Sequence, residues 1–370
     1  MVRDEVPGQA QNNTIESVDT IRSKCPSCGG ELVYSPEDEQ LICLYCGTKV
    51  PLDLTPVEIE EHDFDEWSKH PEMQDKAETL VAEVACGQCG AHTTFPENTT
   101  SYTCAFCGTP IVLKESVQRR SLKPEYMLPF KMGKKQCDDR FRKWVSSRWF
   151  APSGFSRELS LQERMKGVYL PYWTYDADTV TVYEGARGVN RQVRGVSNGK
   201  TVTRTVTDWY PVSGTVHYVF DDVLVPASDS LPPDISQVLT NWDRKNYVAY
   251  NEQFMRGFLT ELYRKDFREC YPQAKKQMES YISALVRSEI GGNQQRIRRQ
   301  DTRYSDVKFK HVLLPVWLSA YRYKNKSYVF AVNGRTGQVF GQRPWSIPKI
   351  MLLILVLAAV LAVLFYFGGG

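Results

Sequence analysis

The sequence lacks the short motifs that mark common enzyme classes. Only five of its 370 residues are histidines, and their scattered positions give no H-E-x-x-H zinc-protease helix. A G-x-S-x-G nucleophile elbow and the protein-kinase motifs are also missing. The stretch from Gly195 to Thr201 falls one residue short of a phosphate-binding loop, and strand-forming residues follow it where that loop needs a helix. These absences predict a protein that is not an enzyme.

An excess of charge of one sign is missing as well. The chain has 46 Lys and Arg against 43 Asp and Glu, which gives a net charge of +3 at pH 7. The balance hides blocks: residues 51–83 contain eleven acidic side chains against Lys69 and Lys76. This run predicts a solvated acidic linker over 54–83 whose later part, 71–84, has helical character. The polar residues 1–21 predict a disordered N-terminus.

Eight of the ten cysteines fall into two copies of one pattern, C-x2-C-x14-C-x2-C, shifted by 61 residues. The first copy consists of Cys25, Cys28, Cys43 and Cys46, and the second of Cys86, Cys89, Cys104 and Cys107. Two such knuckles facing each other across a hairpin supply the four thiolates of a structural zinc site. Glycine follows the second and fourth cysteine of each copy and lets the backbone fold over the sulfurs. The spacing predicts two zinc ribbons, 22–53 and 84–115, with one structural zinc ion each.

Disulfides and iron fit the cysteine pattern less well than zinc does. Disulfides need an oxidising compartment, and we see no signal peptide ahead of the first ribbon. A mononuclear iron site uses similar knuckles, usually within a larger aromatic core. A shell of four thiolates is closed, so it leaves no position open for a substrate. Cys137 and Cys270 stand apart, and Cys137 shares a helical stripe with Phe141 and Val145, which predicts a buried core thiol.

A long apolar run lies at the far end of the sequence. Residues 350–367 contain no polar or charged side chain other than Tyr366. At about 1.5 Å rise per residue, a helix of this length matches a bilayer's hydrocarbon thickness. We therefore expect a transmembrane helix over 348–367, bracketed by Trp345 and Tyr366, that holds the protein in the bilayer through 350–367. Arg343 and Lys349 precede the apolar residues 350–367, so the positive-inside rule predicts a single-pass cell-membrane protein with its N-terminal part in the cytoplasm.

Residues 121–345 are long enough for one substantial α+β domain. Helices are expected near 134–149, 251–267 and 272–290, with Trp149 on the buried face of the first and Tyr281 on that of the third. Hairpins are expected at 173–183 and 317–330. A Leu-Pro pair recurs at 128, 170 and 314, and a proline within a strand indicates an edge or the start of the strand. The fold class is thus α+β: two small β ribbons, antiparallel hairpins with three or more helices, and one membrane helix.

An extra hairpin is expected over 186–214, with its turn at Ser197 to Lys200. Its basic side chains are the candidate contacts for nucleic acid or anionic lipid: Arg187, Arg191, Arg194, Lys200 and Arg204. Basic strands with aromatic neighbours can bind phosphate and stack bases. A cytoplasmic domain held near an anionic membrane is also basic, and a protein partner is the third interpretation. The adjacent pair Asp221 and Asp222 is interpreted as surface charge.

Several strings in combination resemble a family of bacterial membrane-anchored tandem zinc-ribbon proteins, often labelled as transcription-factor-IIB-type zinc ribbons or as related to the primosomal helicase. The resemblance rests on the paired ribbons, the terminal apolar span and five further segments. These segments are Leu128-Pro-Phe-Lys-Met, Arg148-Trp-Phe-Ala-Pro152, Gly167-Val-Tyr-Leu-Pro-Tyr-Trp-Thr-Tyr-Asp176, His311-Val-Leu-Leu-Pro-Val-Trp317 and Val332-Asn-Gly-Arg-Thr-Gly337. The resemblance implies a role beside envelope-stress components such as phage-shock-type and flotillin-like proteins. It implies no reaction, and the chain has no helicase ATPase motif.

Two functional hypotheses follow. The preferred one is a membrane-anchored zinc-binding adapter that recruits cytoplasmic protein partners to the membrane. The alternative is a membrane-associated nucleic-acid-binding zinc-ribbon protein that uses the ribbons and the basic hairpin.

Overall fold

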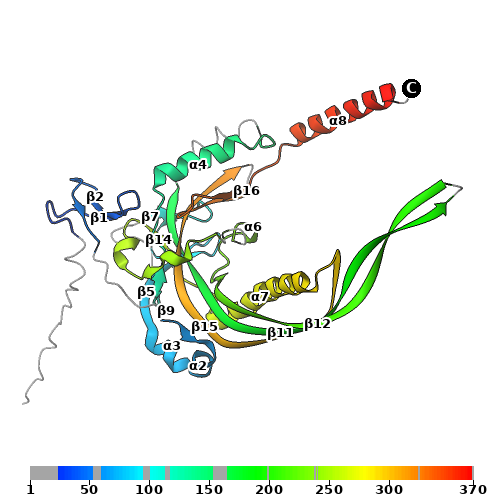
Figure 1. The fold of residues 1–370 in the computed structure, drawn as a ribbon. Helices are drawn as coiled ribbons and strands as arrows, with labels where there is room; N and C mark the ends of the chain where they lie inside the picture. The colour runs from blue at the N-terminus through cyan, green and yellow to red at the C-terminus, as the bar shows by residue number, and fades with distance from the viewer. Residues whose placement is uncertain are drawn as a thin grey trace, which may run out of the picture.

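The computed structural model describes residues 24–52, 60–94, 101–112, 117–152, 165–197, 200–236, 239, 241–323 and 326–368. The expected disordered N-terminus, 1–21, lies outside these residues. Within them the chain forms an α+β fold with four β-sheets and six α-helices. Figure 1 shows a body from which two elements project: a long curved β-arm and a single helix near the C-terminus. The expected fold class is confirmed.

Three very long strands form the backbone of the fold: β11 (Lys166–Ser197), β12 (Lys200–Pro226) and β15 (Gln294–Tyr323). They are antiparallel neighbours in the order β12-β11-β15 within a nine-stranded sheet. The expected separate hairpins at 173–183 and 186–214 are wrong, because both belong to the single β11–β12 hairpin. Its turn does lie where the sequence placed it, since Ser197 pairs with Lys200.

Short strands complete this sheet. They are β4 (His62–Asp63), β10 (Tyr126–Met127), β13 (Val248–Ala249), β14 (Leu259–Thr260), β16 (Lys326–Asn333) and β17 (Val339–Gly341). Of these, β4, β10 and β16 pair with β15 on the side away from β11, and β14 pairs with β11. The expected hairpin at 317–330 is confirmed as β15–β16, in which Tyr323 pairs with Lys326.

The recurring Leu-Pro pairs meet at the centre of the sheet. Leu170 of β11 lies opposite Leu314 of β15, and the backbone N–H of Leu128 donates to the carbonyl of Leu313 at 3.0 Å. Pro171 and Pro315 therefore lie inside central strands, so the expectation of edge or strand-start positions is wrong. Proline removes a donor but keeps its acceptor, and the carbonyl of Pro171 accepts from Ala227 at 3.0 Å.

Helix α7 (Phe267–Ile290) packs along the face of β11, β12 and β15, as Figure 1 shows. It begins earlier than expected because Asp266 and Glu269 form a capping box. Gly291, at φ 67°, ends it as predicted. The buried stripe consists of Phe267, Cys270, Ala274, Met278, Ile282, Val286 and Ile290. Tyr281 is 46% exposed, so its predicted inward position is wrong.

Helix α4 (Lys134–Ser146) is close to the expected helix and buries Cys137, Phe141 and Val145. Trp149 lies beyond its end and is exposed, which corrects its predicted place on the buried face. The helix expected over 251–267 is wrong. This segment holds only the 3-10 turn η2 (Glu252–Met255), Gly257 at φ 86°, and β14. Phe254, Leu259 and Leu262 are nonetheless buried, so the segment packs its apolar residues on the core without forming a helix.

The acidic linker is not a free solvated spacer where the structure describes it. It contains β4, α2 (Phe64–Lys69), α3 (Pro71–Ala77) and the first residues of β5 (Glu78–Ala85), so the expected helix over 71–84 is half strand. The Phe64 ring lies 5.6 Å from Phe267, and the Trp67 ring lies 5.6 Å from Phe309. Two aromatic side chains thus hold this acidic segment against helix α7 and strand β15.

Small sheets carry the cysteine quartets. The first contains β1 (Leu32–Ser35), β2 (Gln40–Cys43) and β3 (Lys49–Val50). Around the second quartet, β6 (His92–Thr93), β5 and β9 (Val117–Leu122) form one sheet, and β7 (Ser101–Thr103) pairs with β8 (Pro110–Val112). The short helices α6 (Pro233–Ser236) and η1 (Arg244–Asn246) lie in the segment after β12, and α8 (Ile347–Gly368) follows β17.

Candidate metal sites and the surfaces around them

The eight predicted ligands form two separate groups of four sulfurs. In the first ribbon, Sγ of Cys25 lies 3.5 Å from Cys46, and Sγ of Cys28 lies 3.5 Å from Cys43. Each group brings all four of its sulfurs within 4.8 Å of one another. The second ribbon repeats the arrangement, with 3.6 Å between Cys86 and Cys107 and 3.7 Å between Cys89 and Cys104.

These distances fit four ligands around one ion. A tetrahedron with bonds of about 2.3 Å to zinc places its sulfurs about 3.8 Å apart. A disulfide would bring two sulfurs to about 2.05 Å, and all eight cysteines are free thiols. The chain therefore has two clusters of four cysteines that can each bind a metal ion.

The two ribbons repeat each other beyond the sulfurs. The glycine after the second and fourth cysteine has positive φ in both copies, from 69° to 73°, at Gly29, Gly47, Gly90 and Gly108. Each of these glycines donates its N–H to the carbonyl of the cysteine four residues back, at 2.8–3.0 Å. An L side chain rarely adopts this conformation, so glycine closes each knuckle. The predicted role of these glycines is confirmed.

A threonine two residues after the last cysteine contacts the cluster in both copies. The Thr48 hydroxyl lies 3.1 Å from Sγ of Cys46, and Thr109 lies 3.2 Å from Sγ of Cys107. The hydroxyl and N–H of Thr48 lower the pKa of Cys46 to about 6. In the second ribbon, the neighbouring thiol of Cys89 lowers the pKa of Cys104 to about 5. In each quartet one sulfur thus favours the thiolate, the form that binds metals, whereas the interaction with Cys104 raises the pKa of its neighbour Cys89.

The first ribbon is docked on the large domain through Tyr34. Its hydroxyl donates to the carbonyl of Phe130 at 3.1 Å, and its ring meets Phe254 edge-on at 5.0 Å. Its backbone N–H donates to the carbonyl of Arg256 at 3.1 Å. Cys25 and Cys43 lie in the same hydrophobic cluster as the body. The first group of four cysteines is therefore continuous with the hydrophobic core of the domain.

The second ribbon is joined to the body by backbone pairing. The N–H of Thr94 donates to Thr260 at 2.8 Å, and the N–H of Leu262 donates to His92 at 3.1 Å. Gly108 approaches so closely that a Cβ there would lie 3.3 Å from the carbonyl oxygen of Ala320. Both ribbons are thus fixed to the α+β domain at defined positions.

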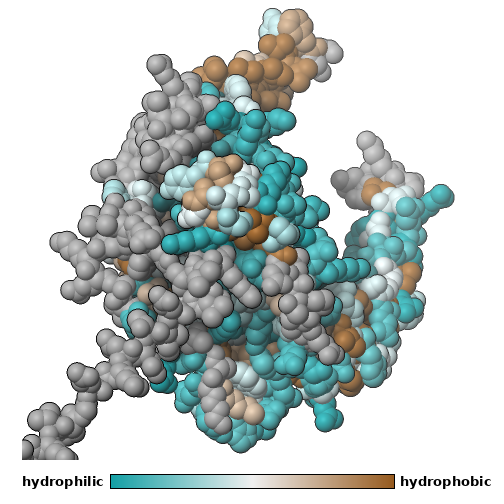
Figure 2. Space-filling view, turned by 90° about the vertical axis from the view of Figure 1, so that its left-hand side faces the viewer, coloured by the Kyte–Doolittle hydropathy of each residue, from teal (hydrophilic) through white to brown (hydrophobic). Residues whose placement is uncertain are grey.

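Helix α8 is the only helix in the described residues that is long and apolar enough to cross a membrane. Within the stretch Ile347–Phe367, the most apolar 18-residue window has a mean hydropathy of 3.1, and none of that window is buried inside the protein. Figure 2 shows it as a hydrophobic segment that projects from a largely hydrophilic surface. A helix that is apolar all round and unburied is typical of a membrane span.

The predicted basic residues occupy different environments along the arm. Arg187 donates from Nε to the carbonyl of Ile290 at 2.6 Å, so it caps the C-terminal end of α7. Arg191 pairs with Asp208 at 2.5 Å. Arg194 and Arg204 are exposed near the end of the arm. Lys200 starts β12 by backbone pairing, and its side chain lies outside the described parts.

A buried ionic cluster was missed by the sequence. The ammonium of Lys310, 4% exposed, lies 2.6 Å from Glu61 and 2.8 Å from Asp222. Asp222 is buried, which corrects its assignment to surface charge, and its N–H donates to Asp176 at 2.5 Å. Burial and the neighbouring Glu61 carboxyl raise the pKa of Asp176 to about 7. Burial opposes the charge on Lys310, but the carboxylates outweigh it and raise the pKa of Lys310. The cluster ties the acidic linker to the sheet.

Comparison with known proteins supplies a relative but no activity. The chain is similar to the uncharacterized protein YdjG of Bacillus subtilis (strain 168), with 27% identity over 332 residues. The similarity covers 89% of this chain and 92% of that protein. No family model matches the chain, and no solved structure matches it.

Proposed function

We propose that the protein is a membrane-anchored zinc-binding adapter that positions cytoplasmic partners at the membrane face. The proposal rests on one observation: three features occur together in this chain. Two clusters of four cysteines are built into the core of an α+β domain, and an unburied apolar helix follows that domain. These features support a scaffold with a fixed shape and a single anchor.

Zinc is the ion that the clusters fit best. Four thiolates in a tetrahedron are typical of structural zinc sites, and such a shell leaves no open position for a substrate. The zinc ions would therefore supply folding free energy rather than catalysis. This argument also supports a binding role over an enzymatic one. The thiolates require a reducing compartment, in agreement with an N-terminal part that faces the cytoplasm.

The partners of such an adapter are proteins. The arm formed by β11 and β12 projects from the body, as Figure 1 shows, and such a projecting hairpin offers a surface for a protein partner. A resemblance to membrane-anchored tandem zinc-ribbon proteins supports partners from envelope-stress systems, such as phage-shock-type or flotillin-like proteins.

A second candidate function is nucleic-acid binding by the arm. Arg194 and Arg204 are exposed on it, and the Arg296 guanidinium lies 3.8 Å from the centre of the Trp209 ring near its base. A basic ribbon with an aromatic side chain can follow a phosphate backbone and stack a base. Such binding would weaken steeply as salt rises. Lack of binding to single-stranded DNA and RNA at low salt would remove this candidate.

The test compares the full-length chain with one that ends at Trp345, both expressed in cells and captured from whole-cell detergent extracts after cross-linking. The full-length chain should resist an alkaline carbonate wash, whereas the shortened chain should be released. Both should carry metal, and only the full-length chain should recover the same membrane-associated partner in repeated captures. Recovery of no partner by the metal-loaded full-length chain would contradict the adapter role. Release of the full-length chain by carbonate would contradict the anchor.

A further inference from the structure

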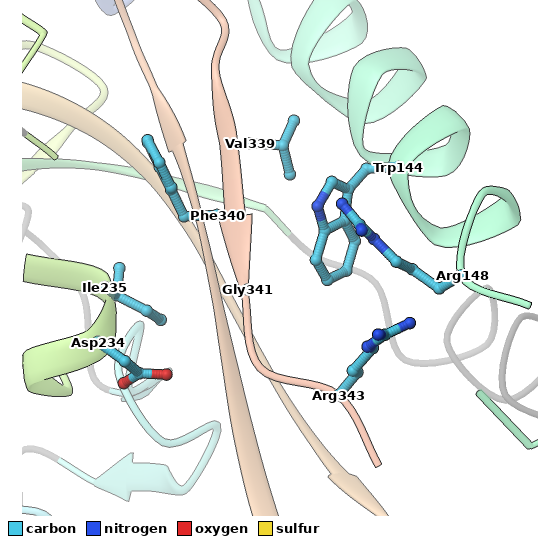
Figure 3. A pocket seen from close by; sticks show the side chains of 8 residues that line it. All are labelled: Trp144, Arg148, Asp234, Ile235, Val339, Phe340, Gly341 and Arg343. Carbon is cyan, nitrogen blue, oxygen red and sulfur yellow. The ribbon is translucent and has the colours of Figure 1, made fainter. Parts of the chain in front are cut away.

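A pocket lies on the body close to the start of α8, since its lining includes Arg343, four residues before Ile347. Its volume is about 310 Å³, and it lies between the end of α4, strand β17 and helix α6. Trp144 and Arg148 line one side with Arg343, and Asp234 lines the other. Figure 3 shows Trp144 and both arginines on one side of β17, across the strand from Asp234. The two guanidinium groups therefore share one wall of the pocket.

Both arginines are positioned by aromatic rings and not by acidic side chains. The Arg148 guanidinium carbon lies 4.6 Å from the centre of the Trp144 ring, and that of Arg343 lies 4.3 Å from Trp345. Nε of Arg148 is buried without a hydrogen-bond partner. Among the described residues, no carboxylate forms an ion pair with either arginine. Two such stacked guanidinium groups have donors available for a planar or tetrahedral oxyanion.

Asp234 does not neutralise this wall. Its carboxylate oxygens accept from the side-chain amide of Gln342 at 3.2 and 3.3 Å. The pocket thus presents two positive groups on one side and a hydrogen-bonded carboxylate on the other. An anion that binds here would approach the arginines from the side that faces away from α6.

The pocket also lies at the expected level of lipid headgroups. Lys349, in the first turn of α8, donates to the carbonyl oxygens of Trp149 at 3.0 Å and Ala151 at 2.8 Å. These bonds tie the segment after α4 to the start of the apolar helix. Trp149 and Trp345 are 57% and 60% exposed beside it. Exposed tryptophans at the end of a membrane helix are typical of the membrane–water interface.

We propose that this pocket binds the phosphate group of an anionic phospholipid, held by Arg148 and Arg343. The proposal rests on the membrane anchor proposed above. A volume of about 310 Å³ is at the low end of the range for small-molecule sites, so the pocket takes a headgroup while the acyl chains stay in the bilayer beside α8. A bound headgroup fixes the angle at which the body, and with it the arm, stands on the membrane.

The test uses the full-length protein in nanodiscs of phosphatidylcholine with a minor fraction of phosphatidylglycerol. Native mass spectrometry then counts the phosphatidylglycerol molecules that remain bound to each protein released from the nanodisc. The wild-type protein should retain one such lipid. The double variant Arg148→Gln, Arg343→Gln should bind it about thirtyfold more weakly, the loss expected when two basic residues near a membrane surface are removed.

A matched control removes the same charge elsewhere. The double variant Arg194→Gln, Arg204→Gln on the arm should retain the lipid as the wild type does. Equal loss in both variants would overturn the proposal, because general charge would then account for binding. No loss in the pocket variant would also overturn it. Inorganic phosphate that displaces the lipid at millimolar concentration would show a free-anion site and overturn the lipid assignment.

Two further readouts separate this proposal from the anchor and from misfolding. Retention after a carbonate wash reports on α8 alone, so a pocket variant that stays in the membrane but loses the lipid supports the pocket and leaves the anchor intact. Arg148→Lys with Arg343→Lys keeps the charge but removes the planar fork, and it should restore only part of the lipid binding. Metal content and far-ultraviolet circular dichroism equal to wild type show that each variant is folded.

Discussion

Acidification should destabilise the protein through His311. Its side chain is 4% exposed, and its ring lies 4.7 Å from that of Trp173 and 5.4 Å from that of Tyr263. Neither ring nitrogen makes a hydrogen bond of good geometry among the described residues, and the effect of burial on the pKa outweighs the opposing effect of the Leu122 backbone. Burial lowers the pKa of His311 from 6.5 to about 3, because the charged form would lose its hydration.

The sign and size of the effect follow from this shift. Between pH 6.5 and pH 3 the unfolded chain binds a proton at His311 that the folded chain does not bind, so the free energy of unfolding falls as the pH falls. Below the pKa of His311 in the unfolded chain, each further pH unit lowers the free energy of unfolding by about 1.4 kcal/mol. His311 alone should therefore lower it by about 2 kcal/mol between pH 7 and pH 5.

The assay compares wild type with His311→Phe, in which a ring of similar shape fills the same site. Urea unfolding of the full-length protein in detergent, followed at pH 7 and pH 5 with zinc in excess, gives the two free energies. The wild type should lose about 2 kcal/mol more than the variant on going to pH 5. Effects common to both chains, such as protonation of the cysteine ligands, cancel in this difference. An identical loss in the two proteins would refute the reasoning.

Other predictions concern the ion cluster, the metal ligands and the packing. Lys310→Met should lower the free energy of unfolding by about 3–5 kcal/mol, because it leaves carboxylates unpaired in the interior. Asp222→Asn added to it should recover part of this loss, and simple additivity in denaturant titrations would contradict the cluster. Cys43→Ser should lower the metal content by one ion per chain in elemental analysis, whereas Cys137→Ser, a change at a buried core thiol, should leave it intact; equal losses would contradict the assignment. Gly334→Ala would place a methyl group 2.7 Å from a backbone oxygen. It should cost about 1–3 kcal/mol, measured as a lower melting temperature, and an unchanged melting temperature would contradict this packing.

The features that the sequence predicted well are local. A zinc ribbon needs four cysteines and tight knuckles within about 22 residues, and all of that information lies in the spacing. An apolar run of membrane length is equally local. The end of α7 was also correct, since Gly291 stops the helix through its own backbone conformation.

The features that it missed depend on distant partners. The sequence predicts two hairpins, at 173–183 and 186–214, where the structure has the single hairpin of β11 and β12. In the structure a bulge lies at Gly185, where a Cβ would come within 2.5 Å of the carbonyl oxygen of Arg296. The glycine permits close approach by another strand and does not interrupt its own.

No local pattern in the sequence could have predicted the buried ion cluster. Glu61 and Lys310 are 249 residues apart in the sequence and meet at one point of the sheet. Tertiary packing likewise decides the segment at 251–267, where apolar residues at helical spacing fill a loop. Periodicity records which residues are buried, but not the backbone shape that buries them.

The central claim is that eight sulfurs hold two zinc ions within a domain anchored by α8. Elemental analysis of the full-length protein, purified under reducing conditions from carbonate-washed membranes and passed over a mild chelator, tests it most directly. Two zinc ions per chain would agree with the account. Less than one tightly held metal ion per chain, or two iron ions in place of zinc, would contradict it.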